Sequence, residues 1–304
     1  MSYDIRRLKG SIAPVVTPFD QNLEVDHETL RQLIDWQIEE GSHGISVTGT
    51  TGEPSSLSLQ ERQEIFRTTV NTAAGRVPVV LATGSNNLEE TLALTHQAEV
   101  LGADAALVIV PYYNRPSQEG LYRYFIEVAK STTLPIILYN IPGRTAVNLE
   151  PSTMKRIRTT AENVIGVKEA NRDFEQVSMV FSTVGRDFLV YSGIEALCYP
   201  MLMLGGAGHI SATANLMPRE VADLFNKVVE GDYPGALDLH FQLLPLNQAL
   251  FWETNPGPVK AAMGLMGRIH PALRLPMQMP DPSLTERLAD VLRTYGLIDA
   301  KEVH

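Results

Sequence analysis

Residues 163–169 have the sequence NVIGVKE, a short apolar run rich in β-branched residues that ends in a lysine and a glutamate. An uninterrupted run of this kind is typical of a strand buried on both faces in a parallel sheet. Lys168 then lies at the carboxyl end of the strand. Burial there favours the neutral amine, which can attack a carbonyl carbon. We therefore treat Lys168 as a candidate Schiff-base lysine; the structural alternative is a lysine whose stem is buried and whose amine reaches solvent.

The other lysines of the chain do not occupy a comparable position. Lys9 precedes the first predicted strand, and the rest lie in predicted helices, namely Lys130, Lys155, Lys227, Lys260 and Lys301. The sequence therefore offers Lys168 as its one candidate for a Schiff base.

Length and composition limit the possible classes of protein. The chain has 304 residues, 44% of them hydrophobic, so it can bury a large core. Its formal net charge of −10 disfavours nucleic acid and anionic membrane as partners. The single cysteine, Cys198, cannot form an intrachain disulfide, and we expect it to pack in the core. No segment approaches the roughly 20 apolar residues of a membrane helix, so we expect a soluble, cytoplasmic protein.

Strand-like and helix-like segments alternate along most of the chain. The predicted strands are residues 12–16, 44–47, 77–82, 105–110, 135–140, 163–169, 188–191 and 209–212. The predicted helices between and after them are residues 26–40, 58–74, 88–101, 119–130, 174–184, 195–204 and 218–230. Asp26 is a predicted N-cap, and Ser58 with Glu61 matches a capping box. This order predicts an α/β fold, a (β/α)₈ TIM barrel, rather than an open sheet.

The barrel is predicted to occupy residues 1–232. Residues 233–304 are helical by pattern and are interrupted at Pro256, Pro258 and Pro276. We expect them to form an appended C-terminal helical subdomain.

Polar residues follow the carboxyl ends of several predicted strands, which is the face where TIM barrels form their active sites. They are Thr50, Thr51, Tyr113, Tyr139, Arg144 and Lys168. Loops are polar in general, so the placement of these residues carries more weight than their polarity.

Lys168 and Tyr139 end adjacent predicted strands, so their side chains can converge, and a phenol can shuttle the protons that imine formation requires. Thr50 and Thr51, between two glycines, offer hydroxyl and backbone N–H groups to a carboxylate. Arg144 can bind a second carboxylate through two parallel hydrogen bonds. The structural alternatives are that Tyr139 is a core residue, that Thr50 and Thr51 form a turn that caps the next helix, and that Arg144 forms a surface ion pair.

Other chemistries fit the sequence poorly. Residues 206–208 lack the third glycine of a dinucleotide fingerprint, and no phosphate-binding Gly/Lys loop is present. The seven histidines show no metal-ligand spacing, and His209, the only one in a predicted barrel strand, is expected to line the core or the site. We expect neither a metal nor an organic cofactor.

Four motifs in order resemble the dihydrodipicolinate synthase / N-acetylneuraminate lyase family: GTTGE at 49–53, PYYNRP at 111–116, YNIPGRT at 139–145 and GVKE at 166–169. The resemblance runs from about residue 12 through NPGPVK at 255–260. It implies a (β/α)₈ barrel with C-terminal helices, usually assembled as a homotetramer. It also implies a class I lyase or aldolase, which forms a Schiff base between the strand-six lysine and pyruvate or another 2-oxo acid.

The same resemblance implies the catalytic roles. Lys168 carries the imine. Tyr139 and Thr50 form a proton relay with Tyr113, which reaches in from a neighbouring subunit.

It also implies the substrate contacts. Thr50 and Thr51 hold the carboxylate of pyruvate, helped by the backbone of Gly193 and Ile210. Arg144 binds the carboxylate of the second substrate, as in the dihydrodipicolinate synthases, which condense pyruvate with aspartate semialdehyde. The tyrosine pair and the arginine favour this synthase branch over the sugar-acid lyases.

Three positions depart from the synthase pattern: His209, Gly257 and Pro54. The first and last are expected near the mouth of the barrel, where they would favour another aldehyde. The open alternatives are a catabolic 2-oxo acid aldolase or dehydratase, such as a 2,4-dihydroxyhept-2-ene-1,7-dioate aldolase or a 2-keto-3-deoxy sugar acid aldolase. A non-catalytic, ligand-binding barrel is a further alternative, which the intact relay disfavours.

The resemblance bears on regulation as well, because many synthases bind lysine, the end product of their pathway, at a subunit interface. Asn86, Glu90 and Tyr112 match that site, whereas Pro54, Leu59 and Arg62 depart from it. We therefore expect weak or absent inhibition by lysine.

Overall fold

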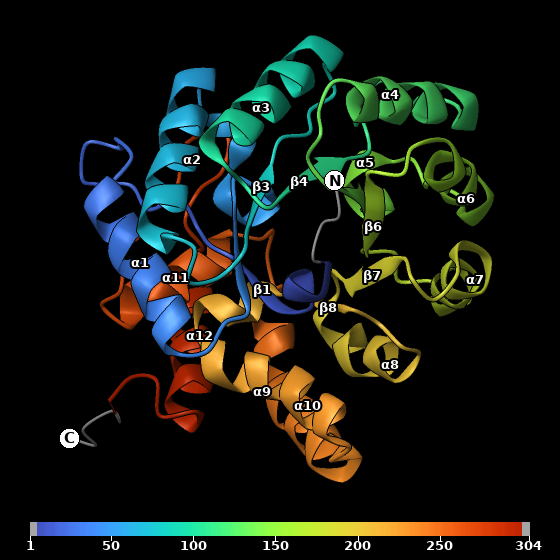
Figure 1. The fold of residues 1–304 in the computed structure, drawn as a ribbon. Helices are drawn as coiled ribbons and strands as arrows, with labels where there is room; N and C mark the ends of the chain where they lie inside the picture. Colours follow the sequence, from blue (N-terminus) through green and yellow to red (C-terminus); the bar gives the residue numbers. More distant parts are fainter. Residues whose placement is uncertain (1–4, 300–304) are drawn as a thin grey trace.

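Short apolar segments form parallel strands that close into a barrel in chain order, with the last strand paired to the first (Figure 1). The structure is a computed structural model that describes residues 5–299. The strands are β1 (Gly10–Pro14), β2 (Gly44–Val47), β3 (Val79–Ala82), β4 (Ala105–Ile109), β5 (Ile136–Asn140), β6 (Val164–Glu169), β7 (Leu189–Ser192) and β8 (Gly208–His209). Almost every strand residue is buried, because side chains pack both inside the barrel and against the helices. The predicted TIM barrel is confirmed.

Helices surround the barrel as an outer layer (Figure 1). They are α1 (His27–Glu39), α2 (Leu59–Ala73), α3 (Leu88–Leu101), α4 (Gln118–Lys130), α6 (Pro151–Thr160), α7 (Phe174–Val184), α8 (Cys198–Met203) and α9 (Pro218–Glu230). The predicted caps are confirmed: Asp26 accepts from the N–H of Thr29, and Ser58 forms a capping box with Glu61.

Helix α6 is not among the helices whose bounds were predicted, although Lys155 within it was assigned to a helical pattern. Its sequence is largely polar, and only Thr153, Met154 and Ile157 are buried, so its apolar periodicity is weak. The signal that could have located it is Pro151 at the first helical position, where the missing N–H costs nothing.

The predicted elements 195–204 and 209–212 differ from the structure for identifiable reasons. Residues 195–204 form a 3₁₀ helix (Glu195–Leu197) followed by α8, because Pro200 has no N–H to continue a single helix. Strand β8 ends at His209 rather than at residue 212, because the Ser211 hydroxyl accepts from the N–H of Thr213 and starts another 3₁₀ turn.

The apolar core has two parts. One fills the inside of the barrel, where the Tyr191 hydroxyl donates to the Leu8 carbonyl at 2.7 Å and so attaches the N-terminal 3₁₀ helix to the amino end of the barrel. The other lies between strands and helices and includes Cys198, so the predicted packing role of this cysteine is confirmed.

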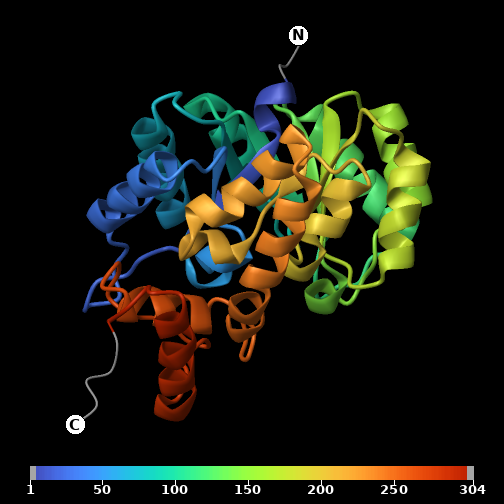
Figure 2. The ribbon, with the colours of Figure 1, turned by 90° about the horizontal axis from the view of Figure 1, so that it is seen from below.

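The C-terminal helices are α10 (Tyr233–Ala249), α11 (Gly257–Leu265) and α12 (Pro282–Thr294). Helix α10 packs against α8 and α9, whereas α12 extends beyond the end of the barrel opposite the N-terminus (Figure 2). Their apolar side chains join the core of the barrel helices, so the predicted division at residue 232 stays a prediction. No helix within residues 5–299 combines the length and the apolar character needed to cross a membrane.

One buried ion pair joins α11 to the loop after β2. The Lys260 ammonium is fully buried and donates to the Glu53 carboxylate and, at 2.8 Å, to the Ala272 carbonyl. It also lies 4.1 Å above the ring of Phe19. Burial lowers the pKa of Lys260 to about 8, and contact with Glu53 opposes that shift.

The prediction that no other lysine occupies a setting comparable to that of Lys168 is wrong with respect to burial, because Lys260 is more deeply buried. Glycine and prolines around residues 255–260 obscured the apolar pattern that signals a buried helix. Because its amine is held by Glu53 outside the cavity described below, Lys260 does not compete as a nucleophile. Lys301, which was predicted to be helical, lies outside the described residues.

We expect Lys260→Met to lower the free energy of unfolding by about 3–5 kcal/mol, because it leaves the buried Glu53 carboxylate without its ammonium partner. Glu53→Gln is expected to be destabilising for the converse reason. The double variant should lose less than the sum of the two single variants, because neither charge is then left alone. Urea unfolding measures all three, with Lys227→Met, which breaks an exposed pair with Asp232, as a near-neutral control. Strictly additive losses would contradict the assigned pairing.

Candidate active site

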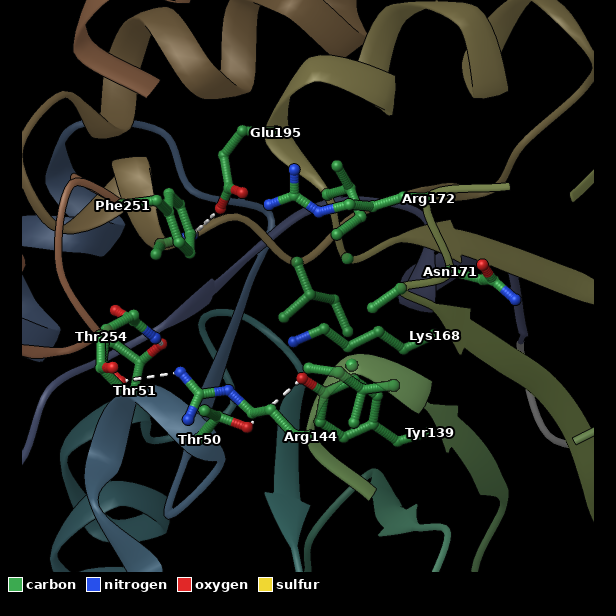
Figure 3. Close-up of a pocket in the computed structure, with 18 of the residues that line it drawn as sticks. Thr50, Thr51, Tyr139, Arg144, Lys168, Asn171, Arg172, Glu195, Phe251 and Thr254 are labelled. Atoms are coloured by element: carbon green, nitrogen blue, oxygen red, sulfur yellow. Dashed lines mark hydrogen bonds between the residues drawn. The ribbon is translucent and has the colours of Figure 1, made fainter. Parts of the chain in front are cut away.

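A cavity of about 770 Å³ opens at the carboxyl ends of the strands (Figure 3). Its walls come from the loops after β2, β5, β6, β7 and β8, and from residues 251–255 ahead of α11. The site residues predicted from the sequence that line it are Thr50, Thr51, Tyr139, Arg144, Lys168, Gly193 and Ile210. The remaining one, Tyr113, does not line the cavity of its own chain.

The register of the barrel places Lys168 next to Tyr139. The two residues are direct partners across β5 and β6, and the Lys168 amine lies 4.3 Å from the centre of the Tyr139 ring. Lys168 is only 6% exposed, and no hydrogen bond or ion pair within residues 5–299 occupies its amine. The amine is therefore buried beside an apolar face yet free to react, as the Schiff-base interpretation requires.

Gly193 makes room for the lysine stem. A Cβ atom at this position would lie 2.8 Å from Cε of Lys168 and 2.9 Å from Cβ of Ala170, so a larger residue would displace the lysine. The glycine is thus a steric requirement of the buried lysine as well as part of the cavity wall.

The hydroxyls of Thr50 and Tyr139 lie 3.3 Å apart, and either can donate. Thr50 and Thr51 begin a 3₁₀ helix (Thr50–Gly52), whose first N–H groups have no partner within the helix. The Thr51 hydroxyl accepts from the side-chain amide of Asn255 at 3.1 Å. This turn therefore presents N–H and hydroxyl groups to a ligand, and residues ahead of α11 hold it in place.

Arg144 lies in the short helix α5 (Pro142–Thr145) after β5. Its guanidinium crosses the cavity and donates to the backbone carbonyl of Asn255 at 2.9 Å (Figure 3). A carbonyl leaves the positive charge of Arg144 uncompensated, and among residues 5–299 no carboxylate pairs with it, so the structure does not support a surface ion pair. The remaining N–H groups can bind an anion at the rim.

Glu169, next to Lys168, supports the site from the opposite face of β6. Its carboxyl group is fully buried, accepts from the Asn140 amide at 2.9 and 3.1 Å, and accepts from the N–H of Asn171. Burial raises the pKa of Glu169 to about 7. Because successive strand residues face opposite sides, this network fixes the strand end that carries Lys168 without entering the cavity.

The structure corrects the expected positions of two unusual residues. His209 is fully buried between β8 and α9, where its Nε2 lies 2.9 Å from the carbonyl of Val221. Burial lowers the pKa of His209 to about 4, so the ring is neutral and Nε2–H donates. Pro54 begins a 3₁₀ helix (Pro54–Ser56) and does not line the cavity either. Neither residue therefore favours a different aldehyde.

The cavity residues that the predicted site lacks include Arg172, Glu195 and Asn255. The first two follow strands β6 and β7, so the rule that located the other polar residues could have found them. Glu195 was instead assigned to the start of a helix, residues 195–204, and Asn255 lies in a segment far from the barrel in the sequence. Within residues 5–299, no group of three or more His, Cys, Asp or Glu side chains is arranged to hold a metal ion.

Tyr113 lies in the loop between β4 and α4, with 91% of its surface exposed. Its φ of 71° is unusual for a bulky residue, so the loop holds the ring in a strained conformation away from its own chain.

Comparisons with known proteins agree with this geometry. A 4-hydroxy-tetrahydrodipicolinate synthase of Thermus thermophilus is 47% identical over 291 residues, which cover 95% of this chain and 97% of that protein. The structure of dihydrodipicolinate synthase from Aquifex aeolicus has a TM-score of 0.93 and 41% identity, covering 95% of this chain and 98% of that chain. The chloride-inhibited dihydrodipicolinate synthase from Acinetobacter baumannii, complexed with pyruvate, has a TM-score of 0.93 and 37% identity, with 95% and 99% covered. The dihydrodipicolinate synthetase family model matches residues 7–294, and the chain belongs to that family.

Proposed function

We propose that this chain acts as a 4-hydroxy-tetrahydrodipicolinate synthase, a lyase that condenses pyruvate with aspartate semialdehyde through a Schiff base. The observation that carries the proposal is the unpaired, buried amine of Lys168 beside Tyr139, at the mouth of a barrel of this family. The Thermus relative bears this name, and the Acinetobacter structure holds pyruvate.

In the proposed mechanism the Lys168 amine adds to the C2 carbonyl of pyruvate and forms a carbinolamine. Loss of water then gives the iminium, and loss of a proton from C3 gives the enamine, whose C3 attacks the aldehyde carbonyl. Carbinolamine formation and loss of water each move a proton at the former carbonyl oxygen. The hydroxyls of Tyr139 and Thr50, 3.3 Å apart, form a path for these protons.

The cavity offers separate positions for the two carboxylates. We assign the pyruvate carboxylate to the turn at Thr50 and Thr51, with the backbone of Gly193 and Ile210 opposite. We assign the carboxylate of the aldehyde to Arg144 at the rim, where the guanidinium has N–H groups to spare.

We infer a homotetramer from two exposed surfaces. Tyr113, 91% exposed and strained, fits insertion into a neighbouring subunit, where its hydroxyl would complete the relay. A second surface on the packed helices α8 and α10 exposes Met203, Leu204, Leu237 and Phe241. Two distinct self-complementary interfaces are what a tetramer of twofold-related dimers needs. The cytoplasmic location stays a prediction.

The alternative functions gain no support from the site. His209 and Pro54, which favoured a catabolic aldolase or dehydratase, do not line the cavity. A non-catalytic barrel would have no need for a buried amine with an adjacent hydroxyl pair.

We expect borohydride reduction in the presence of pyruvate to attach a pyruvyl group to the peptide that contains Lys168. Lys168→Ala should abolish both the adduct and the activity, and Lys227→Ala should leave the adduct on Lys168, because the Lys227 amine lies in an exposed ion pair with Asp232. Mass spectrometry of the digested protein locates the modification. An unmodified Lys168, or activity retained by Lys168→Ala, would refute the mechanism.

The second substrate can be tested with pyruvate and a series of aldehydes. Aspartate semialdehyde should be turned over faster than succinic semialdehyde and uncharged aldehydes. Arg144→Ala should lower kcat/KM mainly for the carboxylated aldehydes, by about 10- to 100-fold, since a charged hydrogen bond contributes about 1.5–3 kcal/mol. Arg144→Lys should recover only part of the loss. Arg123→Ala, on the exposed face of α4, is the control. Preference for an uncharged aldehyde together with a neutral Arg144→Ala would overturn the substrate assignment.

A cation of the protein already pairs with Glu90 at the position where the family resemblance implies a lysine site. Arg62 is 3% exposed, donates to the Glu90 carboxylate at 2.8 Å, and donates to the carbonyl of Ala82. Glu90 is therefore neutralised within the chain, although Asn86 and Tyr112 match the family pattern. A second ammonium group would have to displace a buried guanidinium.

We accordingly expect lysine to inhibit weakly or not at all. Initial rates measured over micromolar to millimolar lysine should change little, with the pyruvate concentration held near its KM. Strong inhibition by lysine below the millimolar range would show that Arg62 does not block the site.

A further inference from the structure

Glu195 is an enclosed carboxyl group in the wall of the cavity. It is 7% exposed and begins the 3₁₀ helix that follows β7. One of its oxygens accepts from the N–H of Ala212 at 2.8 Å and from the Ser211 hydroxyl at 3.4 Å. Within residues 5–299 no other residue donates to the second oxygen, which is not sealed from the cavity. The fold thus holds a carboxyl group firmly and leaves one oxygen for the contents of the cavity.

Glu195 and Lys168 share this cavity. Figure 3 shows the Glu195 carboxyl group pointing into the space that the Lys168 amine enters from β6. The two groups are not in direct contact, since no ion pair joins them within 4.0 Å. Burial raises the pKa of Glu195, and the N–H of Ala212 and the charge of Lys168 oppose that shift. Glu195 is therefore a carboxyl group that shares the cavity with the amine without forming an ion pair with it.

The other ionisable groups around Glu195 do not supply a buried positive charge that could pair with its carboxylate. Cys198, on the adjoining helix, has its pKa raised by burial and is an uncharged thiol. Arg172, after β6, and Glu253, ahead of α11, lie at the exposed rim. Tyr139, on β5, is engaged with Thr50. Lys168 is the one buried amine among the groups that line the cavity in the described part of the chain.

We propose that Glu195 is the charge partner of the iminium formed on Lys168: its carboxyl group is neutral while the amine is free and ionised once the iminium exists. The inference rests on the proposed function. Amine, ketone and carboxylic acid become iminium, water and carboxylate. A bond forms between the Lys168 nitrogen and C2 of pyruvate, and the bond between C2 and the ketone oxygen breaks. The oxygen leaves as water, with one proton from the amine and one from the Glu195 carboxyl group. The buried site therefore keeps the same net charge in both states.

This arrangement resolves a conflict at the lysine. A permanent carboxylate next to the free amine would hold it as an ammonium, which is not nucleophilic. A permanently neutral neighbour would leave the iminium cation without compensation in a buried site. A carboxyl group that is neutral beside the free amine and ionised beside the iminium avoids both costs. The pyruvate carboxylate contributes less compensation because the N–H and hydroxyl groups of the turn at residues 50–52 bind it.

The test is the pH dependence of pyruvate affinity, measured by borohydride trapping in the full-length protein. Glu195→Gln keeps an oxygen for the Ala212 N–H but cannot ionise. We expect it to weaken pyruvate affinity about tenfold near neutral pH. Without the carboxyl group, forming the iminium from a neutral amine takes a proton from solution. The affinity for pyruvate then falls tenfold for each unit by which the pH rises. In Glu195→Gln this fall should begin at a lower pH than in the wild type. Glu195→Asp should restore the pH at which the affinity begins to fall in the wild type. Glu175→Gln, on the exposed face of α7, is the control.

Calorimetry of the wild type gives a second readout that needs no variant. Pyruvate binding measured at neutral pH in buffers of different ionisation enthalpy should show no net proton uptake. Uptake of one proton per site, or a Glu195→Gln protein with wild-type affinity and pH onset, would overturn the role of Glu195 and leave the Schiff base intact. Absence of any trapped adduct on the wild type would instead overturn the proposed function itself.

Discussion

The buried ion pair between Glu53 and Lys260 is the contact on which the arrangement of the site depends. Glu53 directly follows the 3₁₀ turn that carries Thr50 and Thr51, and Lys260 belongs to α11 in the C-terminal segment. Two buried charges tolerate little displacement, because separation leaves each one desolvated and alone. The pair therefore fixes how the C-terminal segment meets the barrel. Asn255, five residues ahead of Lys260, is then placed to contact both the Thr51 hydroxyl and the Arg144 guanidinium.

A second constraint comes from the barrel itself. The register between β5 and β6 makes Tyr139 and Lys168 neighbours, and the same pairing brings Asn140 next to Glu169 on the outer face. The inner pair lines the cavity, whereas the outer pair belongs to a closed hydrogen-bond network. Alternation along two strands thus produces a chemical site on one side and its support on the other. Gly193 on the next loop leaves the space that the lysine stem fills.

The sequence predicts the barrel and most of the site because both rest on local patterns. Apolar runs locate strands, and polar residues at their ends, such as Thr50 and Arg144, locate the mouth. Contacts between distant segments carry no such signal: nothing in the sequence near Lys260 indicates that it is buried against Glu53. Glu195 was missed because its neighbours suggest a continuous helix, which Pro200 interrupts. His209 was misplaced because the end of a two-residue strand cannot be located to within one residue, and one residue decides which face a side chain takes.

The charge of the whole chain and the charge of its cavity point in opposite directions. The protein carries a formal charge of −10, yet its proposed substrates are anions. The cavity resolves this, because Lys168, Arg144 and Arg172 line it, whereas its acidic residues are the enclosed Glu195 and the rim residue Glu253. Salt screens surface charge over about 8–10 Å, but charges that face one another across a partly buried cavity are screened far less. Local cations therefore decide binding. If Glu195 is neutral in the free protein, as proposed, the cavity is more positive when it receives pyruvate than after the iminium has formed, and the ionised carboxyl group then offsets the charge that the reaction creates.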